Sequence, residues 1–382
     1  MKKLLSRLLA TLAVGLLSGC LFNGGGSSAG PDPTLPLPGV EPPPPPMVAY
    51  VTGLGADLTS FDVDPTTGGL TQLSPPIEAG FNPMQVVVDP ASRFAYVAAY
   101  DSRSVRSFRL DPASHLPSFA DESQLLPDFR VRSVAVHPSG KFVYGTDEIN
   151  DRVAMFAVDS TTGELTAMAP ETVAAGDSPY FIVAHPNGKF AYVANIGDDT
   201  IGVYEIDETT GVLTERPERL FSLPAAAANP TILAIDSAGE FLYLGSTGAA
   251  SESITAFAVD SATGALTLLG TPLSFEGQNP EGIAVHPSGK FVYVAAEVGN
   301  LLSAYAIVSN TLTFIDSFAA GDLPSDVAVD VTGKFVYVTN RNDSTIRIFS
   351  IDQTTGALMP RGQPFALPAG YSPLSIAISE KK

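Results

Sequence analysis

A phrase built around the dipeptide Tyr-Val, or a close variant of it, returns throughout the chain after residue 46. Its successive tyrosines are 46, 48, 48, 51, 50 and 44 residues apart, and they are Tyr50, Tyr96, Tyr144, Tyr192, Tyr243, Tyr293 and Tyr337. A repeat of this length, made of short alternating apolar runs, is typical of a β-propeller whose blades have four strands each. No helical periodicity follows the first twenty residues. The repeat therefore limits the chain to an all-β ring of blades.

Each repeat reads as four strands, named a to d from the axis outward. Strand a is the Ile-Ala-Val run, strand b is the Lys-Phe-Val-Tyr-Val run, and a hairpin joins strands c and d. The first repeat begins at strand b near Met47, whereas the last apolar run, residues 374–379, is a strand a with no successor. We therefore predict a seven-bladed propeller with four-stranded blades. Its C-terminal strand closes the ring by joining the blade that residues 48–53 begin.

Three of the four histidines stand in one recurring turn, so the turn has to be weighed as a repeated active site. It joins strands a and b and reads His-Pro-Ser-Gly-Lys at residues 137–141 and 286–290. A side-chain acceptor, a proline and a glycine in this order suit a type I turn. Aspartate replaces the histidine in other repeats, and we therefore interpret the turn as architecture. His115 lies in a degenerate c–d hairpin and is expected to be a surface substitute for glycine.

The c–d hairpins repeat the motif Asp-x-x-Thr-Gly-x-Leu. Its aspartates are Asp64, Asp159, Asp207, Asp260 and Asp352. Aspartate and threonine can bond backbone amides in such a turn, and glycine tolerates the left-handed conformation. Calcium binding is the alternative, but the loops lack the ligand series of an EF-hand. We predict neither a metal site nor a cofactor.

The first twenty residues have the pattern of a bacterial secretory signal. Three basic residues precede a short apolar run over residues 8–17, and small residues then lead to Cys20. This run is too short for a resting transmembrane helix, so we predict a signal peptide over residues 1–19. Residues 17–20, Leu-Ser-Gly-Cys, resemble the lipobox of bacterial lipoproteins, which implies cleavage before Cys20 and lipidation of that residue. An ordinary signal peptide with an incidental cysteine is the alternative.

The lipobox resemblance implies a lipoprotein of the bacterial cell envelope. Leu21 stands where inner-membrane retention usually requires aspartate, which favours the outer membrane, with the protein facing the periplasm or the outside. Residues 20–46 are predicted to form a tether that is first Gly/Ser-rich and then Pro-rich. Such a composition favours an extended polyproline II spacer, and plain disorder is the alternative. The propeller domain is expected over residues 47–382.

The charge of the chain limits its partners. With 21 basic and 40 acidic residues the formal net charge is −19, so we expect no nucleic acid partner. Removal of the signal peptide takes away three basic residues and leaves 18 basic and 40 acidic ones. An anionic membrane surface repels such a domain, so the N-terminal lipid must anchor it. We expect a monomer, and its single cysteine permits no internal disulfide.

A functional site should lie where the repeats differ. The a–b and c–d connections share one face of a propeller, to which all four histidines map. The b–c and d–a connections share the other face with the mouth of the channel. There the residues mix aromatic, acidic and basic groups, as in a ligand pocket, although a water-filled channel is the alternative. The predicted ligand-binding mouth consists of Gln85, Tyr100, Arg132, Glu148, Tyr180, Glu281, Glu297, Asp326 and Arg341.

The repeated motifs resemble those of the lactonase-type seven-bladed propellers. The phrases are Gly-Lys-Phe-Val-Tyr-Val-Thr-Asn at residues 333–340, Pro-x-x-Ile-Ala-Val-His-Pro at residues 280–287 and the c–d hairpin motif. This family includes phosphogluconolactonase-like and carboxymuconate-cyclase-like proteins and grades into the YVTN-repeat surface proteins. The resemblance covers residues 47–379 and implies their fold.

The resemblance also implies histidine, arginine and glutamate at the mouth of active relatives, and this chain departs from that pattern. Glu297 matches the glutamate of one family signature, but Glu281 and Gly282 stand where arginine and histidine are expected. Tyr180 replaces the histidine of a second signature. The mouth is therefore predicted to have no imidazole base for neutral pH.

Two functions from different classes stay open on these residues. The first is a lipid-anchored module that binds a small metabolite or an envelope or surface protein through its mouth. The alternative is a lactonase-like hydrolase or cyclase acting on a sugar-acid lactone or a muconolactone. Its catalytic residues would be Glu297, Arg341 and Arg132. The sequence alone does not decide whether the chain is an enzyme.

Overall fold

The structure, a computed structural model, describes residues 43–124, 128–248, 252–275, 277–309 and 311–382. The predicted signal peptide, Cys20 and nearly all of the predicted tether lie outside these residues. Pro44–Lys382 form one compact unit. Within the described ranges, no helix is long and apolar enough to cross a membrane.

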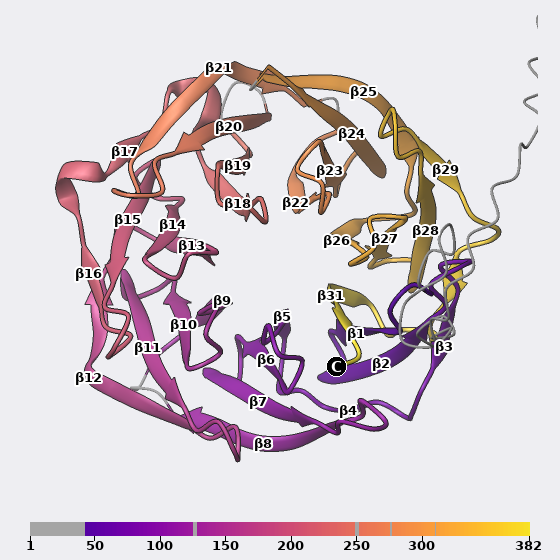
Figure 1. Ribbon diagram of the computed structural model, residues 1–382, viewed down its shortest axis with the longest axis horizontal. Coiled ribbons are helices and arrows are strands. Elements are labelled where there is room, and N and C mark those ends of the chain that lie inside the picture. Colours follow the sequence, from indigo (N-terminus) through magenta and orange to yellow (C-terminus); the bar gives the residue numbers. More distant parts are fainter. Residues whose placement is uncertain (1–42, 125–127, 249–251, 276, 310) are drawn as a thin grey trace, which may run out of the picture. The chain divides into compact units, whose positions relative to one another are not determined.

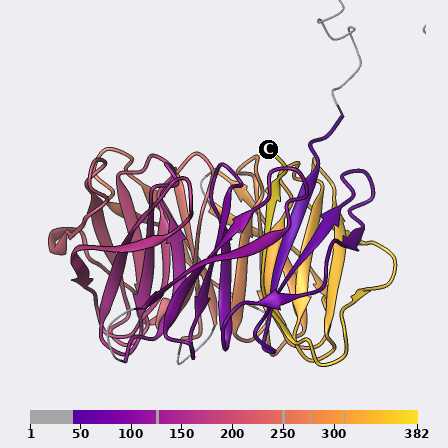
Figure 2. The ribbon, with the colours of Figure 1, turned by 90° about the horizontal axis from the view of Figure 1, so that it is seen from below.

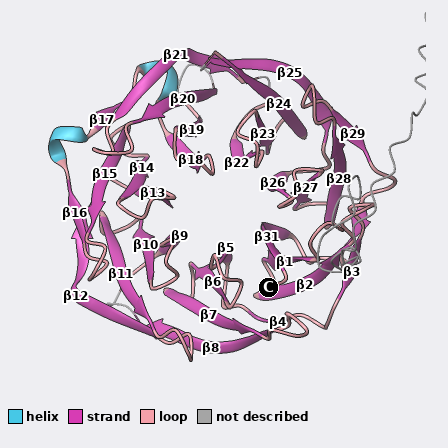
Figure 3. Cartoon of the chain, viewed as in Figure 1, coloured by secondary structure: helices cyan, strands magenta, loops and turns pink. Residues whose placement is uncertain are grey.

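The compact unit is a ring of blades around a central axis (Figure 1). In the described residues the strands form seven antiparallel sheets, and each sheet is one blade. Apart from the strands, that part of the chain contains two short 3-10 helices (Figure 3), which are η1 (Pro217–Arg219) and η2 (Ala225–Ala227). The predicted all-β, seven-bladed propeller is confirmed.

The strands of each blade are given from the axis outward. The first blade contains β31 (Pro373–Glu380), β1 (Met47–Gly53), β2 (Asp57–Val63) and β3 (Leu70–Gln72), with β4 (Ile77–Glu78) also paired to β2. The second contains β5 (Pro83–Val88), β6 (Phe94–Ala99), β7 (Ser104–Leu110) and β8 (Pro117–Gln124), and the third contains β9 (Val131–Val136), β10 (Phe142–Asp147), β11 (Arg152–Val158) and β12 (Leu165–Ala174). The fourth contains β13 (Pro179–Ala184), β14 (Phe190–Asn195), β15 (Thr200–Ile206), β16 (Leu213–Glu215) and β17 (Phe221–Ser222).

The remaining three blades follow the same order. The fifth contains β18 (Pro230–Ile235), β19 (Phe241–Ser246), β20 (Ser253–Val259) and β21 (Leu266–Ser274), and the sixth contains β22 (Pro280–Val285), β23 (Phe291–Ala296), β24 (Leu301–Val308) and β25 (Thr311–Ala319). The seventh contains β26 (Pro324–Val329), β27 (Phe335–Asn340), β28 (Thr345–Ile351), β29 (Leu358–Pro360) and β30 (Phe365–Ala366).

Both ends of the propeller meet in the first blade. β1 pairs with β2 on one side and with β31 on the other, so that Met47 lies opposite Glu380. The backbone N–H of Lys381 also donates to the carbonyl of Pro46 at 2.8 Å. Figure 2 shows the C-terminus and the N-terminal end of β1 on the same face of the ring. The predicted closure is confirmed, and the inner strand that completes the first blade comes from the far end of the chain.

Five of the seven repeated tyrosines join their blade to the next through a hydroxyl hydrogen bond. Tyr144 lies in β10, and its hydroxyl donates to the carbonyl of Gly211 in the following blade at 2.8 Å. Gly211 has a φ of +75°, and a Cβ there would lie 2.4 Å from the ring of Phe142. Only glycine combines this left-handed backbone with so close an approach. The Tyr-Val phrase and the hairpin glycine are therefore two halves of one contact between blades.

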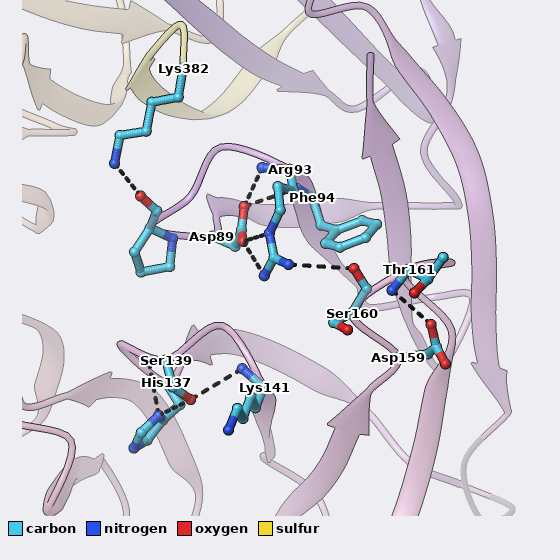
Figure 4. Close-up of polar contacts among 11 residues, drawn as sticks. Asp89, Arg93, Phe94, His137, Ser139, Lys141, Asp159, Ser160, Thr161 and Lys382 are labelled. Atoms are coloured by element: carbon cyan, nitrogen blue, oxygen red, sulfur yellow. Dashed lines mark hydrogen bonds and ion pairs between the residues drawn. The ribbon is translucent and has the colours of Figure 1, made fainter. Parts of the chain in front are cut away.

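The hairpin aspartates stabilise their own turns. Oδ1 of Asp159 accepts hydrogen bonds from the backbone N–H groups of Thr161 and Thr162 at 2.8 Å each, and Figure 4 shows the first of them. These bonds lower the pKa of Asp159, because they favour its charged form. In the described part of the chain, no group of three or more His, Cys, Asp or Glu side chains could hold a metal ion.

The a–b turns contain the predicted turn hydrogen bond. The N–H of Gly140 donates to the carbonyl of His137 at 2.8 Å, and the imidazole Nε2 of His137 bonds to the carbonyl of Gly188 in the next blade at 2.8 Å. Where aspartate replaces histidine, the carboxylate of Asp89 accepts the N–H of Phe94 at 3.0 Å within its own turn (Figure 4). The structure thus supports the architectural interpretation of these turns.

The expectation of an exposed His115 is wrong. His115 does occupy the left-handed position of a hairpin glycine, with a φ of 58°. His115 is only 4% exposed, however, and its backbone carbonyl accepts a hydrogen bond from the hydroxyl of Tyr50 at 2.9 Å. The position is buried because it lies at the junction between two blades, where five of the other hairpins have glycine.

Candidate functional site

A cavity of about 70 Å³ lies at the mouth of the channel, on the b–c and d–a side of the ring. Every blade contributes at least one residue from the start of its innermost strand. The residues that line the cavity are Met84, Gln85, Arg132, Tyr180, Phe181, Thr231, Ile232, Glu281, Ser325, Asp326, Arg341, Leu374 and Ser375. Six of the nine predicted mouth residues are among them, namely Gln85, Arg132, Tyr180, Glu281, Asp326 and Arg341.

A repeated irregularity of the inner strands directs these side chains. In β22 the pairing with β23 shifts after Pro280, so that Glu281 has no opposite residue. The same shift follows the first proline of β13 and leaves Tyr180 unpaired in the ladder. A bulge of this kind bends the strand and changes the direction of its side chains. In these two strands the proline that precedes the mouth residue therefore marks the bulge in the sequence, whereas Val131 holds this position before Arg132.

Arg132 and Tyr180 form one side of the cavity. The guanidinium carbon of Arg132 lies 3.9 Å from the ring centroid of Tyr180, and its Nη2 also donates to the tyrosine hydroxyl. Burial lowers the pKa of Arg132, although the carboxylates of Glu281 and Glu148 partly oppose this effect. Arginine stays charged at any ordinary pH, so the cavity contains a fixed, partly desolvated cation.

Glu281 is one of two acidic residues that line the cavity, together with Asp326. Burial raises the pKa of Glu281, and the opposing charges of Arg132 and Arg341 do not cancel this effect. Its Oε1 accepts a hydrogen bond from Nδ2 of Asn279 at 3.0 Å. The same amide nitrogen also donates to Oε2 of Glu297, so Asn279 bridges the two glutamates.

Glu297 is engaged by its neighbours. Its Oε1 lies 3.1 Å from Nη2 of Arg341, and its other oxygen accepts the amide of Asn279. The side chains of Glu297 and Arg341 are 16% and 27% exposed, so this is a half-buried ion pair. Arg341 lines the cavity, whereas Glu297 lies behind it and is not part of the lining. The structure thus brings the three predicted catalytic candidates into one cluster with Glu281.

Gln85 and Asp326 occupy equivalent positions and link neighbouring blades. Oε1 of Gln85 accepts the hydroxyl of Ser133 at 2.8 Å, and Oδ2 of Asp326 accepts the hydroxyl of Ser375 at 2.8 Å. Burial raises the pKa of Asp326 to about 6. Both side chains line the cavity, but each has an oxygen bound to the next blade.

Tyr100 and Glu148 stand beside this cluster. Burial and the charge of Glu148 raise the pKa of Tyr100, whose ring centroid lies 5.3 Å from the guanidinium carbon of Arg130. Both residues also influence the pKa of Arg132. Tyr100 and Glu148 do not line the cavity, but their charges act on a residue that does.

Asn279 is the site residue that the sequence analysis did not single out. It precedes Pro280 and has a φ of 62°, a left-handed conformation that asparagine tolerates better than most residues. An Asn-Pro pair before strand a also occurs at Asn82 and Asn229. The pair indicates a turn, but only the folded ring shows that one of these amides binds two carboxylates.

The fold and the site define a class of protein, a seven-bladed propeller with one charged cavity at the channel mouth. The family model described as "Lactonase, 7-bladed beta-propeller" matches residues 52–311 and 272–372. The chain belongs to this family.

Individual relatives are more distant. A 62-residue segment is 37% identical to a 6-phosphogluconolactonase of Formosa agariphila, and this match spans 16% of the chain and 17% of that protein. A solved structure from Bacteroides fragilis, provisionally named a 6-phosphogluconolactonase, has a TM-score of 0.77 at 18% identity and covers 88% of this chain and 98% of its own. The periplasmic gluconolactonase of Pseudomonas aeruginosa has a TM-score of 0.73 at 19% identity, with 88% and 99% coverage. At such identities these two structures show the common fold.

Proposed function

We propose that the chain is a lactone hydrolase, which opens a lactone ring in the mouth cavity or closes it in reverse. Membership of the lactonase family supports this alternative above the binding module. The observation that carries the proposal is the position of Glu281, a half-buried carboxylate that lines the same cavity as Arg132 and Arg341 and whose pKa burial raises. A carboxylate whose pKa is raised toward neutrality can replace the absent histidine as a general base.

The residues present can perform each step of ring opening. Glu281 takes a proton from a water molecule, and the water oxygen bonds to the carbonyl carbon of the lactone. The carbonyl oxygen becomes an oxyanion, which Arg132 stabilises with N–H groups that Tyr180 does not occupy. The bond between the carbonyl carbon and the ring oxygen then breaks. Glu281 returns the proton to the departing alkoxide, which gives the hydroxy acid.

The ion pair behind this chemistry has a positioning role. Asn279 holds one oxygen of Glu281, and Glu297 fixes Asn279 through the same amide. Arg341 neutralises Glu297 and lines the cavity. A cavity of about 70 Å³ holds a few heavy atoms, so the remainder of a substrate would extend out of the mouth.

The test is turnover by the purified full chain on a panel of aldonolactones and muconolactones. We expect Glu281→Gln to lower kcat by about 100-fold or more, because the amide cannot accept a proton. Glu164→Gln is the matched control, since Glu164 is exposed in a c–d hairpin on the other face. Loss of turnover in Glu297→Gln but not in Glu281→Gln would move the base to Glu297. No turnover on any lactone, with ligand-induced thermal shifts instead, would support the binding module.

The cell-envelope anchor is a separate part of the proposal. The lipobox resemblance at Leu17 to Cys20 and the tether after it support an outer-membrane lipoprotein. Metabolic labelling with a palmitate analogue should label the wild-type chain and not Cys20→Ser. Equal labelling of both chains would contradict the anchor and would leave the lactonase proposal untouched.

A further inference from the structure

The channel contains a second and larger cavity, which opens toward the a–b turns, away from the mouth. Its volume is about 660 Å³, within the usual range of ligand pockets. Most of its lining is aliphatic, including Val87, Val136, Val183, Ile235, Val285 and Val331. Gln85 and Phe181 line both this cavity and the mouth cavity, so they mark the boundary between a charged chamber and an aliphatic one.

The inner strands surround the axis in Figure 1, and the aliphatic pattern of the lining is repeated from strand to strand in the sequence. In the six inner strands that lead into an a–b turn, the last two residues before the turn are valine, isoleucine or alanine, as at Val87 and Val88 in β5. Ala377 and Ile378 hold the corresponding positions of β31. In β5, β13, β18, β22 and β26 both of these residues are only half-buried. A continuous apolar surface that stays open to solvent is unusual in a soluble domain and marks a site of binding.

The few polar groups of the lining have partners inside the protein. Oε1 of Gln85 accepts the hydroxyl of Ser133 and the N–H of Val134 at 2.8 Å each. Ser237 donates its hydroxyl to the carbonyl of Pro287 at 3.3 Å. Both ring nitrogens of His286 are bonded, Nε2 to the carbonyl of Gly333 at 2.8 Å. A ligand in this chamber is therefore not required to supply hydrogen bonds, which suits an unsubstituted hydrocarbon chain.

Lysines gather on the face at which this chamber opens. All lysines after residue 3 lie in a–b turns or at the C-terminus, namely Lys141, Lys189, Lys290, Lys334, Lys381 and Lys382. Figure 4 shows Lys141 and Lys382 on this face. Lys141, Lys290 and Lys334 are exposed, and each stands at the end of the turn that follows a channel-lining strand. The hairpin aspartates share the face and stay charged, as backbone N–H bonds keep Asp159, but they join the outer strands c and d, farther from the axis than the a–b turns. Lys189 and Lys381 form ion pairs with Glu208 and Asp62.

We propose that the aliphatic chamber is a second ligand site, which binds a free single-chain anionic amphiphile such as a fatty acid. The hydrocarbon chain lies in the channel, and the carboxylate lies among the lysines of the turns. This site is separate from the mouth cavity and does not depend on the lactonase proposal.

Calorimetric titration of the full chain with octanoate, decanoate and dodecanoate, each below its micelle concentration, tests the chamber. Each added methylene should tighten Kd by about fourfold until the channel is filled. Decanoate should bind at least tenfold more tightly than decyltrimethylammonium, because the lysines attract the carboxylate head group and repel the ammonium head group. No binding of decanoate overturns the proposal, and equal binding of the two head groups overturns its anionic part.

Two variants locate the site. Ala234 lines the chamber and is half-buried, so Ala234→Phe should fill it and weaken decanoate binding at least tenfold. Ala262→Phe is the matched control in the same blade, at an exposed hairpin position, and should bind normally. If Ala234→Phe does not fold, the double variant Lys290→Gln, Lys334→Gln serves instead and should weaken decanoate but not decanol. Unchanged decanoate binding in the folded variant overturns the assignment.

A photoreactive residue in place of Ala234 tests other occupants. Labelling of added decanoate supports the proposal. The contrary result is labelling that falls on the chain's own residues 1–42 or on a second copy of the chain, with none on the fatty acid. That result assigns the chamber to the labelled occupant and overturns the proposal.

Discussion

Tyr144 and Tyr96 occupy the same position of two neighbouring repeats and differ in one hydrogen bond. The hydroxyl of Tyr144 donates to Gly211 at 2.8 Å. The hydroxyl of Tyr96 is buried and has no partner among the described residues. The carbonyl it would be expected to reach, that of Gly163, already accepts the hydroxyl of Ser107 at 2.8 Å. The two tyrosines are therefore a natural pair of test and control.

Removal of the two hydroxyls should have opposite effects. Tyr144→Phe should lower the free energy of unfolding by about 1 kcal/mol, because a buried carbonyl loses its donor. Tyr96→Phe should leave it unchanged or raise it, because an unsatisfied buried hydroxyl is removed. Urea unfolding of both variants measures the difference. Equal destabilisation by the two changes would show that the contact between blades depends on ring packing and not on the hydrogen bond.

Asp326 makes a pH-dependent contribution at the junction of the last blade with β31. Its Oδ2 accepts the hydroxyl of Ser375 and the N–H of Ile376, while burial raises its pKa to about 6. The unfolded value is about 3.9, so the folded state holds the proton more tightly. The contribution of Asp326 to the free energy of unfolding is therefore complete below about pH 4. It is lost as the pH rises through about 6, which lowers the free energy of unfolding by roughly 1–3 kcal/mol.

Asp326→Asn isolates this contribution, because the amide oxygen can still accept the two bonds made at Oδ2 and the side chain does not titrate. The bond from the N–H of Val327 to Oδ1 is lost in this variant, but its loss is the same at every pH. We expect its free energy of unfolding to fall less than that of the wild type between pH 4 and 7. The difference between the two curves removes the effect of other titrating groups. Parallel curves would contradict the raised pKa.

Among the elements, β31 has the largest effect expected on the fold, since it completes the innermost strand of the first blade. Deletion of residues 372–382 exposes β1 and removes the buried side chains of Leu374 and Ile376. These two side chains alone contribute roughly 3–6 kcal/mol. We expect the truncated chain to unfold at much lower urea concentration, or to aggregate through its open edge. Deletion of Lys382 alone is the control, and equal midpoints for all three chains would contradict the closure.

The strands and their order could be predicted from the sequence, whereas the site could be predicted only in outline. The repeat of Tyr50 through Tyr337 specifies seven strands b, and the unmatched run at residues 374–379 specifies the closure. The positions around the mouth follow from the same register. The raised pKa of Glu281 could not be predicted, because it results from burial in the assembled ring, against the opposing charge of Arg132 three blades away. His115 was misjudged for a related reason, since only the assembled ring covers it.

At the scale of the whole molecule, charge is unevenly distributed over a strongly acidic chain. The formal net charge is −19, and the lysines after residue 3 lie on the face opposite the mouth. Around the mouth, Arg132 and Arg341 face Glu281, Glu297 and Glu148, so the local charge does not offset the field of the whole domain. An anionic substrate must therefore approach the cavity against a repulsive long-range potential.

Ionic strength should consequently distinguish charged from neutral lactones. Salt screens the long-range repulsion, since the Debye length is about 10 Å at 0.1 M, but it screens the partly buried arginines much less. We expect kcat/KM for an anionic lactone to rise roughly two- to threefold between 10 and 150 mM salt. For a neutral lactone of the same ring size it should stay constant. A fall with salt for the anionic substrate would show that the arginines, and not the net charge of the domain, govern its approach to the mouth.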